Sequence, residues 1–279
     1  MADFFSRTGP GEGPGLALFL NAGDPPLDVL ADLVLMLDEE GVDCLELAVP
    51  FPDSVTDGPV IRRSARRALD RGVGLDEVLA FIASVRPRLR RLRIALLADW
   101  SHSLKHRDRA HGDPGHTLRT IAGSGADGLL VHALPPRLRA AHYAAAREAG
   151  LPVVTTCYQQ SPPPTMAEAA AEATAYLYLV AHYGRSGTAP ATGHAALATT
   201  VAALRAHTES PIAIGFGVRT RQDVETVGGC GADAVIIGSA GVARIERSLA
   251  QGDDVVDGFR AFVRSVSPNR SITPETTGS

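Results

Sequence analysis

Eight short apolar runs, each followed by a segment with helical periodicity, constrain the fold of this chain more than any other feature. Apolar runs of this length, bounded by glycine and proline, are typical of buried strands. A helix between two strands returns the chain to the end where the next strand begins, so the strands pair in parallel. Eight such units close into a (β/α)8 TIM barrel, with functional residues at the C-terminal ends of the strands. The predicted strands cover residues 16–21, 43–49, 92–97, 128–132, 153–157, 175–181, 212–216 and 234–237.

The alternation extends over nearly the whole chain and predicts one domain. We expect an α/β barrel over residues 15–267, a flexible lead over 1–14 that is rich in glycine and proline, and a disordered polar tail over 268–279. An open doubly wound sheet is the alternative, but no Gly-x-Gly-x-x-Gly opens the first helix. The polar segment 101–115, after the third strand, is expected to be a surface loop or a short helix.

Composition excludes several classes of protein. The 279 residues include 27 basic and 31 acidic side chains, and a net charge of -4 without a basic block argues against nucleic acid as a partner. No apolar run approaches a membrane span, and the first residues do not resemble a secretion signal. Three widely spaced cysteines suit reduced thiols, so we expect a cytoplasmic protein. The single lysine, Lys105, lies in a polar segment and is a poor candidate for Schiff-base chemistry.

Two carboxylates follow one another along the second predicted strand and its loop. Glu46 shares a strand face with Cys44 and Ala48, and such burial disfavours the charged carboxylate and favours proton exchange near neutral pH. Asp57 lies in a more polar loop and is expected to ionise more easily. The pair predicts acid-base catalysis. A structural acid paired with an arginine is the alternative for Glu46.

Small residues end the seventh and eighth strands and predict a phosphate site. Gly217 and the Gly238–Ser239 pair leave the backbone N–H groups open, and the stretch from Ser239 can begin a helix whose positive end faces an anion. The loops after strands 7 and 8 are a recurrent phosphate site in barrels. A glycine-rich loop over residues 183–193 is long enough to close over a substrate. We therefore expect a phosphorylated substrate.

Together these motifs resemble the tryptophan synthase α subunit family over about residues 16–266. That family cleaves indole-3-glycerol phosphate into indole and glyceraldehyde 3-phosphate by a retro-aldol reaction, without metal or organic cofactor. The resemblance implies a cytoplasmic lyase of tryptophan biosynthesis that needs no cofactor. The matching motifs are Asn21-Ala-Gly-Asp-Pro25, Leu45-Glu-Leu-Ala-Val-Pro-Phe51, Asp57-Gly-Pro-Val-Ile61, Tyr176-Leu-Tyr-Leu179, Ile214-Gly-Phe-Gly217 and Gly238-Ser239.

The resemblance also implies roles for individual residues. Glu46 would be the general acid and base at indole C3 and the adjacent hydroxyl, and Asp57 would bind the indole N–H and stabilise the cationic tautomer. Tyr178 would lie near Glu46, and the hydroxyl of Ser186 would reach Asp57 when the loop closes. The aromatic pocket would be lined by Phe19, Leu97, Leu130 and Tyr178, and the phosphate would be bound by Gly187, Gly217, Gly238 and Ser239.

Departures from the family pattern fall in loops where the family's α chain docks on its pyridoxal-phosphate β partner. They are Asp99-Trp-Ser101 after the third strand, Ala133 before Leu134-Pro135, and Pro52-Asp-Ser54 in the second loop. The chemical residues are intact while this surface is altered. A tryptophan synthase β subunit is thus an expected partner with an altered docking surface, and the departures favour a stand-alone indole-producing paralogue.

Two other functions stay open at this point. Histidines at 102, 132 and 182, near the ends of strands 3, 4 and 6, would suit a metal-dependent aldolase on a TIM barrel, although paired ligand spacing is absent. A catalytically weak regulatory barrel that binds a phosphorylated ligand is the other alternative, but such a sensor needs no proton shuttle.

Overall fold

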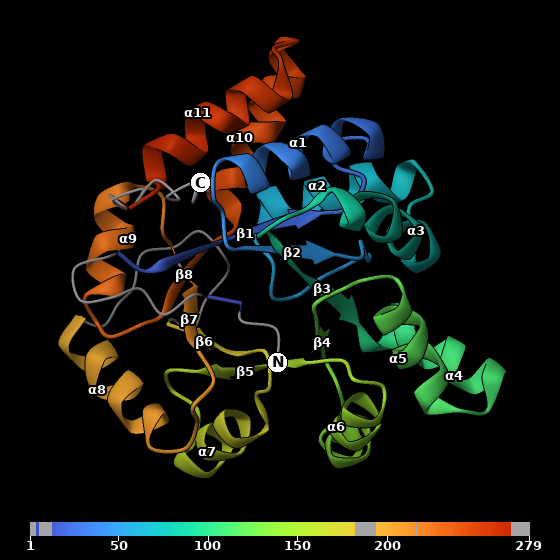
Figure 1. Ribbon diagram of the computed structural model, residues 1–279, viewed down its shortest axis with the longest axis vertical. Helices are drawn as coiled ribbons and strands as arrows, with labels where there is room; N and C mark the ends of the chain where they lie inside the picture. Colours follow the sequence, from blue (N-terminus) through green and yellow to red (C-terminus); the bar gives the residue numbers. More distant parts are fainter. Residues whose placement is uncertain (1–3, 6–12, 182–193, 216, 269–279) are drawn as a thin grey trace, which may run out of the picture.

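Eight parallel strands close into a barrel in sequence order, and helices surround it (Figure 1). The computed structural model describes residues 4–5, 13–181, 194–215 and 217–268. The chain is therefore a (β/α)8 TIM barrel, as predicted. The strands are β1 (Gly15–Asn21), β2 (Cys44–Ala48), β3 (Arg93–Asp99), β4 (Gly128–His132), β5 (Val153–Tyr158), β6 (Tyr176–Val180), β7 (Ile212–Gly215) and β8 (Ala234–Ile237).

Helices follow the strands, and the polar segment after β3, expected to be a surface loop or a short helix, is helical. There the polar segment begins as a π-helical turn, η2 (Trp100–Leu104), and continues as the short helix α4 (Lys105–His111). The other α-helices are α1 (Leu27–Glu39), α2 (Pro59–Asp70), α3 (Leu75–Val85), α5 (Pro114–Gly123), α6 (Arg139–Glu148), α7 (Pro163–Glu172), α8 (His194–Arg205), α9 (Arg221–Gly228), α10 (Ser239–Gln251) and α11 (Val255–Val266). Single 3-10 turns, η1 (Arg86–Arg88) and η3 (Pro136–Leu138), precede β3 and α6.

Local sequence explains the helix boundaries. In α1, Leu30, Leu33 and Leu37 recur at helical spacing and are fully buried against the barrel. Pro26 precedes its first turn, and Gly41 follows its end with a φ of 73°, a backbone conformation that favours glycine. None of the helices in the described part of the chain is long and apolar enough to cross a membrane.

Side-chain alternation along the strands produces two core layers. Residues that point inward form a cluster inside the barrel, which includes Ala17, Cys44 and Ala95. Their neighbours along the strands point outward and pack under the helices, as Leu18 and Leu45 do. Glu46 lies on the inward face of β2, opposite Phe19 of β1 in the parallel register.

Phe4 and Phe5 differ from the expected flexible lead over residues 1–14. Both are 1% exposed, and both rings pack against Tyr176 inside the barrel with centroid distances of 5.3 Å. Short apolar pairs such as this carry no periodicity, so the sequence gives no sign that they enter a core formed far along the chain. Pro268, assigned to the tail, is likewise buried.

Candidate active site

Glu46 is the most deeply buried acid of the inner face and is 2% exposed. The hydroxyl of Tyr176 donates a hydrogen bond to its Oε1 at 2.6 Å, so the recorded partner in the described chain is a tyrosine and not an arginine. Burial raises the pKa of Glu46 from 4.5 to about 7, and the hydrogen bond from Tyr176 opposes this by stabilising the carboxylate. A carboxyl with this pKa can give and take a proton at neutral pH.

Removing the Tyr176 hydroxyl should raise the pKa of Glu46 further. In Tyr176→Phe the carboxylate loses the donor that lowers its pKa, while the burial that raises the pKa remains. A carbon-13 NMR titration of the Glu46 side-chain carboxyl should show a midpoint above that of the native protein. An unchanged or lower midpoint in a folded Tyr176→Phe protein would mean that the hydrogen bond does not control this titration.

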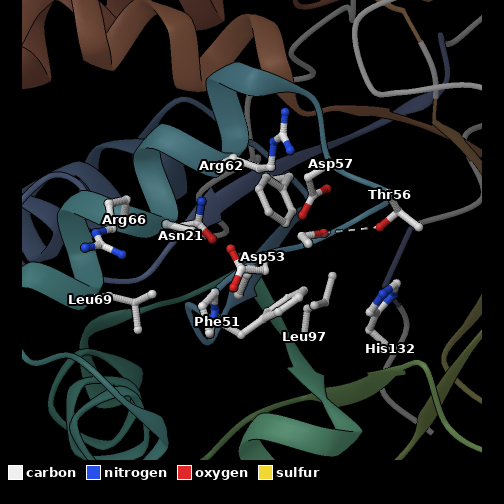
Figure 2. A pocket seen from close by; sticks show the side chains of 15 residues that line it. Asn21, Phe51, Asp53, Thr56, Asp57, Arg62, Arg66, Leu69, Leu97 and His132 are labelled. Carbon is white, nitrogen blue, oxygen red and sulfur yellow. Dashed lines mark hydrogen bonds between the residues drawn. The ribbon is translucent and has the colours of Figure 1, made fainter.

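A cavity of about 250 Å³ opens at the C-terminal ends of β1, β2 and β3, beneath the start of α2 (Figure 2). It holds three residues predicted for the site, Phe19, Asp57 and Leu97. Glu46 is absent from its walls but lies beside Phe19, its partner in the register of β1 and β2. The other lining residues are Asn21, Ala48, Phe51, Pro52, Asp53, Ser54, Thr56, Arg62, Ala65, Arg66, Leu69 and His132.

Asp57 is held in the loop that runs from β2 to α2, and Figure 2 shows it beside Arg62. Burial raises its pKa, whereas a hydrogen bond with Ser54 and the positive charges of His132 and Arg62 lower it. This burial opposes the easier ionisation that the sequence predicts for Asp57. His132 and Arg62 bring positive charge to Asp57, and sequence reasoning assigned neither of them to it.

Phe51 lies between two histidines at the mouth of the cavity. Its ring stacks on His102 and on His132, with centroid distances of 5.7 Å and interplanar angles of 25° in both cases. Nδ1 of His102 lies 2.8 Å from Oδ1 of Asp99, which is 4% exposed. This stack joins the ends of β2, β3 and β4 and fixes the wall opposite α2.

Two loop residues at this mouth have unusual backbones. Asp53 has a φ of 57° and Ala133 a φ of 55°, in the left-handed region that non-glycine residues seldom occupy. Both positions belong to the departures from the family pattern noted above. These departures therefore coincide with left-handed backbone positions in this chain.

Tyr178 and Leu130 lie on the inward faces of β6 and β4. Burial raises the pKa of Tyr178, and the negative charges of Glu46 and Asp57 raise it further, so its hydroxyl stays protonated near both acids. Gly215 makes room for this ring, because a Cβ there would lie 2.5 Å from the Tyr178 hydroxyl oxygen. Leu130 pairs with Leu97 in the register, but it lines a second cavity instead of the first.

The predicted phosphate residues meet at one end of the barrel mouth. Gly217 follows β7 with a φ of 64°, and the Gly238–Ser239 pair begins α10, with Gly238 as the N-cap. Gly238 faces the site, because a Cβ atom built at this glycine would lie 3.8 Å from the Cβ atom of Phe19. Ser186 and Gly187 lie outside the described residues, so the structure does not place them.

Ion pairs fix α10 relative to the strand ends. Arg67 of α2 binds Asp24, which is 1% exposed, through two hydrogen bonds of 2.7 and 2.8 Å. Arg67 and Arg63 also bind Glu246 of α10, and these arginines lower the pKa of Glu246 to about 2. The loop after β1, helix α2 and the predicted phosphate helix therefore form one rigid unit.

The histidines considered as metal ligands are not gathered into a metal site in the described chain. There, no group of three or more histidine, cysteine, aspartate or glutamate side chains could hold a metal ion. His102 and His132 each stack on the ring of Phe51. His182 lies outside the described residues.

Comparisons with known proteins agree with one another. The sequence model of the tryptophan synthase alpha chain family matches residues 6–269. The tryptophan synthase alpha chain of Gloeobacter violaceus is 38% identical over 80% of this chain and 78% of its own length. Among solved structures, the tryptophan synthase A-subunit of Pyrococcus furiosus superposes with a TM-score of 0.78 at 27% identity, covering 91% of this chain and 98% of that one. The alpha subunit of Legionella pneumophila superposes with a TM-score of 0.78 at 25% identity, covering 91% of each chain.

Proposed function

This chain belongs to the tryptophan synthase alpha chain family, and we propose how its own residues carry out that family's reaction. The reaction is the lyase cleavage of indole-3-glycerol phosphate to indole and glyceraldehyde 3-phosphate. The observation that carries our proposal is a buried carboxyl, Glu46, with a pKa of about 7 behind a cavity that presents a second carboxyl, Asp57. The comparisons lend no support to a metal-dependent aldolase or to a regulatory barrel.

Glu46 serves as both the acid and the base. Its protonated carboxyl delivers a proton to indole C3, which leaves a positively charged indolenine. The resulting carboxylate then removes the proton of the side-chain hydroxyl next to C3. The bond between C3 and that carbon breaks, its electron pair returns to the ring, and indole and the aldehyde separate. One residue can take both parts because its pKa lies near neutral pH.

Asp57 stabilises the intermediate. Its carboxylate accepts a hydrogen bond from the indole N–H, and its negative charge offsets the charge that develops on the ring nitrogen. Burial raises the pKa of Asp57, and Ser54, His132 and Arg62 oppose that rise and so favour its carboxylate. Phe19, Leu97, Leu130 and Tyr178 enclose the ring in this proposal.

The phosphate binds at the other end of the substrate. Backbone N–H groups at Gly217, Gly238 and Ser239 and the positive end of α10 would hold it, together with Ser186 and Gly187 from the loop outside the described residues. The ion pairs of Arg67 and Glu246 keep α10 in place.

The tryptophan synthase alpha family forms a complex with a beta subunit. For this chain we propose a weakened coupling, because the departures at Asp53 and Ala133 coincide with unusual backbone conformations around the cavity mouth. The three cysteines are buried and free, which suits a reducing compartment and supports a cytoplasmic location.

One assay tests both proposals. The purified chain is incubated with indole-3-glycerol phosphate, alone and with a tryptophan synthase beta chain, and indole is measured. We expect indole release by the chain alone that the partner does not accelerate. Release that requires the partner would contradict the weakened coupling, and no release under either condition would contradict the proposed roles.

A further inference from the structure

The pairing between β4 and β5 is the shortest in the described barrel. These strands pair only at Leu129 with Val153 and Leu130 with Val154, whereas β3 with β4 and β5 with β6 each pair over five residues. In the described chain no pairing continues beyond Leu130, so the strands separate toward the C-terminal ends where the site lies.

A second cavity of about 250 Å³ occupies this separation. Leu130 and Val154 of its lining belong to the cluster inside the barrel. Thr155 points outward, since its hydroxyl donates to the carbonyl of Ala169 on α7 at 2.6 Å. The cavity therefore passes through the wall, from the barrel interior to the space beneath α6 and α7. His132 lines this cavity and the first one, so the two adjoin.

The outer part of the second cavity is polar. Helices α6 and α7 lie next to one another at the bottom of Figure 1. Helix α6 contributes Arg139, His142 and Tyr143 to the lining, and α7 contributes Thr165 and Glu168. Nε2 of His142 is fully covered and has no hydrogen-bond partner among the residues that the structure describes. Burial lowers the pKa of His142 to about 4, so the ring is neutral at pH 7. A covered polar atom without a partner is rare in native proteins and calls for a ligand or water to satisfy it.

We propose that this cavity is a side chamber of the indole site, and that it accepts a hydroxyl or amino substituent on the benzo ring of the substrate, which displaces the groups that cover His142 Nε2 and hydrogen-bonds to that atom. The proposal rests on the roles proposed for Glu46 and Asp57. Either substituent can donate or accept, so it suits both neutral tautomers of the imidazole.

The placement of the two acids sets the direction of the benzo ring. Glu46 and Asp57 come from β2 and the loop after it, and they hold C3 and N1, which are both on the five-membered ring. The opposite edge of the indole, with carbons 5 and 6, points away from β2 and across the barrel. Leu130 of β4 and Tyr178 of β6 lie on that side, and the separation between β4 and β5 lies between them.

Competition between indoles in the reverse reaction tests the chamber. The native enzyme condenses glyceraldehyde 3-phosphate with indole, 5-hydroxyindole, 6-hydroxyindole or the matching methylindoles, and kcat/KM is compared for each. We expect one hydroxyindole to be favoured over its methyl counterpart. In His142→Leu this preference should fall about fivefold to tenfold, the usual effect of one hydrogen bond. His142→Gln, which retains a polar group, should restore part of it.

His207→Leu provides a matched control, because His207 is an exposed histidine outside both cavities. Nitrogen-15 NMR of the native enzyme gives a second readout, since only the favoured hydroxyindole should shift the His142 Nε2 resonance. An unaltered preference in His142→Leu together with an unshifted resonance would overturn the proposal. An error in the roles proposed for Glu46 and Asp57 would give a different result, because turnover of unsubstituted indole would then also be lost.

Discussion

Glu46→Gln should lose about 10²–10⁴ in the rate of indole release, the usual effect of removing one positioned acid-base group. The amide has nearly the same size and can still accept the hydrogen bond from Tyr176, but it cannot exchange a proton at C3. Substrate binding should persist, because the proposed ring and phosphate contacts are unchanged. Single-turnover kinetics and equilibrium binding of indole-3-glycerol phosphate separate the two effects.

Glu46→Gln lowers the rate of indole release but should raise the free energy of unfolding above neutral pH. The folded carboxyl binds its proton more tightly than the unfolded one, so native stability falls as the pH rises from 4.5 through about 7. The ionised carboxyl in the fold costs on the order of 3 kcal/mol. Glu46→Gln should therefore be more stable than the native protein at about pH 8 and should lose this pH dependence, as measured by urea unfolding.

Glu148→Gln, on the exposed face of α6, is the matched control for both measurements. Normal turnover in a folded Glu46→Gln protein would refute the acid-base role. A variant that is inactive because it fails to bind substrate would instead point to a structural role for the carboxyl.

Asp57→Asn should reduce kcat by about 10²–10³, the range found when one preorganised electrostatic group is removed. The amide can still accept a hydrogen bond from the indole N–H, but it carries no charge to offset the cationic indolenine. The loss should therefore appear mainly in kcat and only weakly in KM, which steady-state kinetics measures directly.

Asp32→Asn, an exposed acid on α1, is the control for general effects of a lost charge. A large rise in KM with kcat unchanged would show that Asp57 contributes equally to ground-state and transition-state binding. That result would contradict its role in stabilising the intermediate.

The fold was predictable because each strand carries its own signal. Every predicted strand is present with ends within two residues, since apolar runs and their glycine or proline boundaries lie within a few residues of one another. The burial of residues near the N-terminus was harder to predict. Phe4 and Phe5 are buried by contacts with Tyr176, about 170 positions further along, and no local pattern encodes such a contact.

The site was predictable in part for the same reason. Strand alternation placed Glu46 inside a strand, motifs placed Asp57 and the glycines in loops after strands, and the family resemblance placed Tyr178 near Glu46. Alternation also puts Tyr176 on the inner face, but the sequence does not say which of two tyrosines reaches an acid across the barrel. The separation of β4 from β5 depends on strand register, which residue patterns did not predict.

The packing of Phe4 and Phe5 on Tyr176 has a practical consequence for anyone who handles this enzyme. These two rings pack on the tyrosine whose hydroxyl donates to Glu46, so Phe4 and Phe5 lie two contacts from the proposed proton donor. Substitutions that shrink either ring should therefore alter the titration of the active carboxyl through Tyr176, although neither ring touches the carboxyl itself.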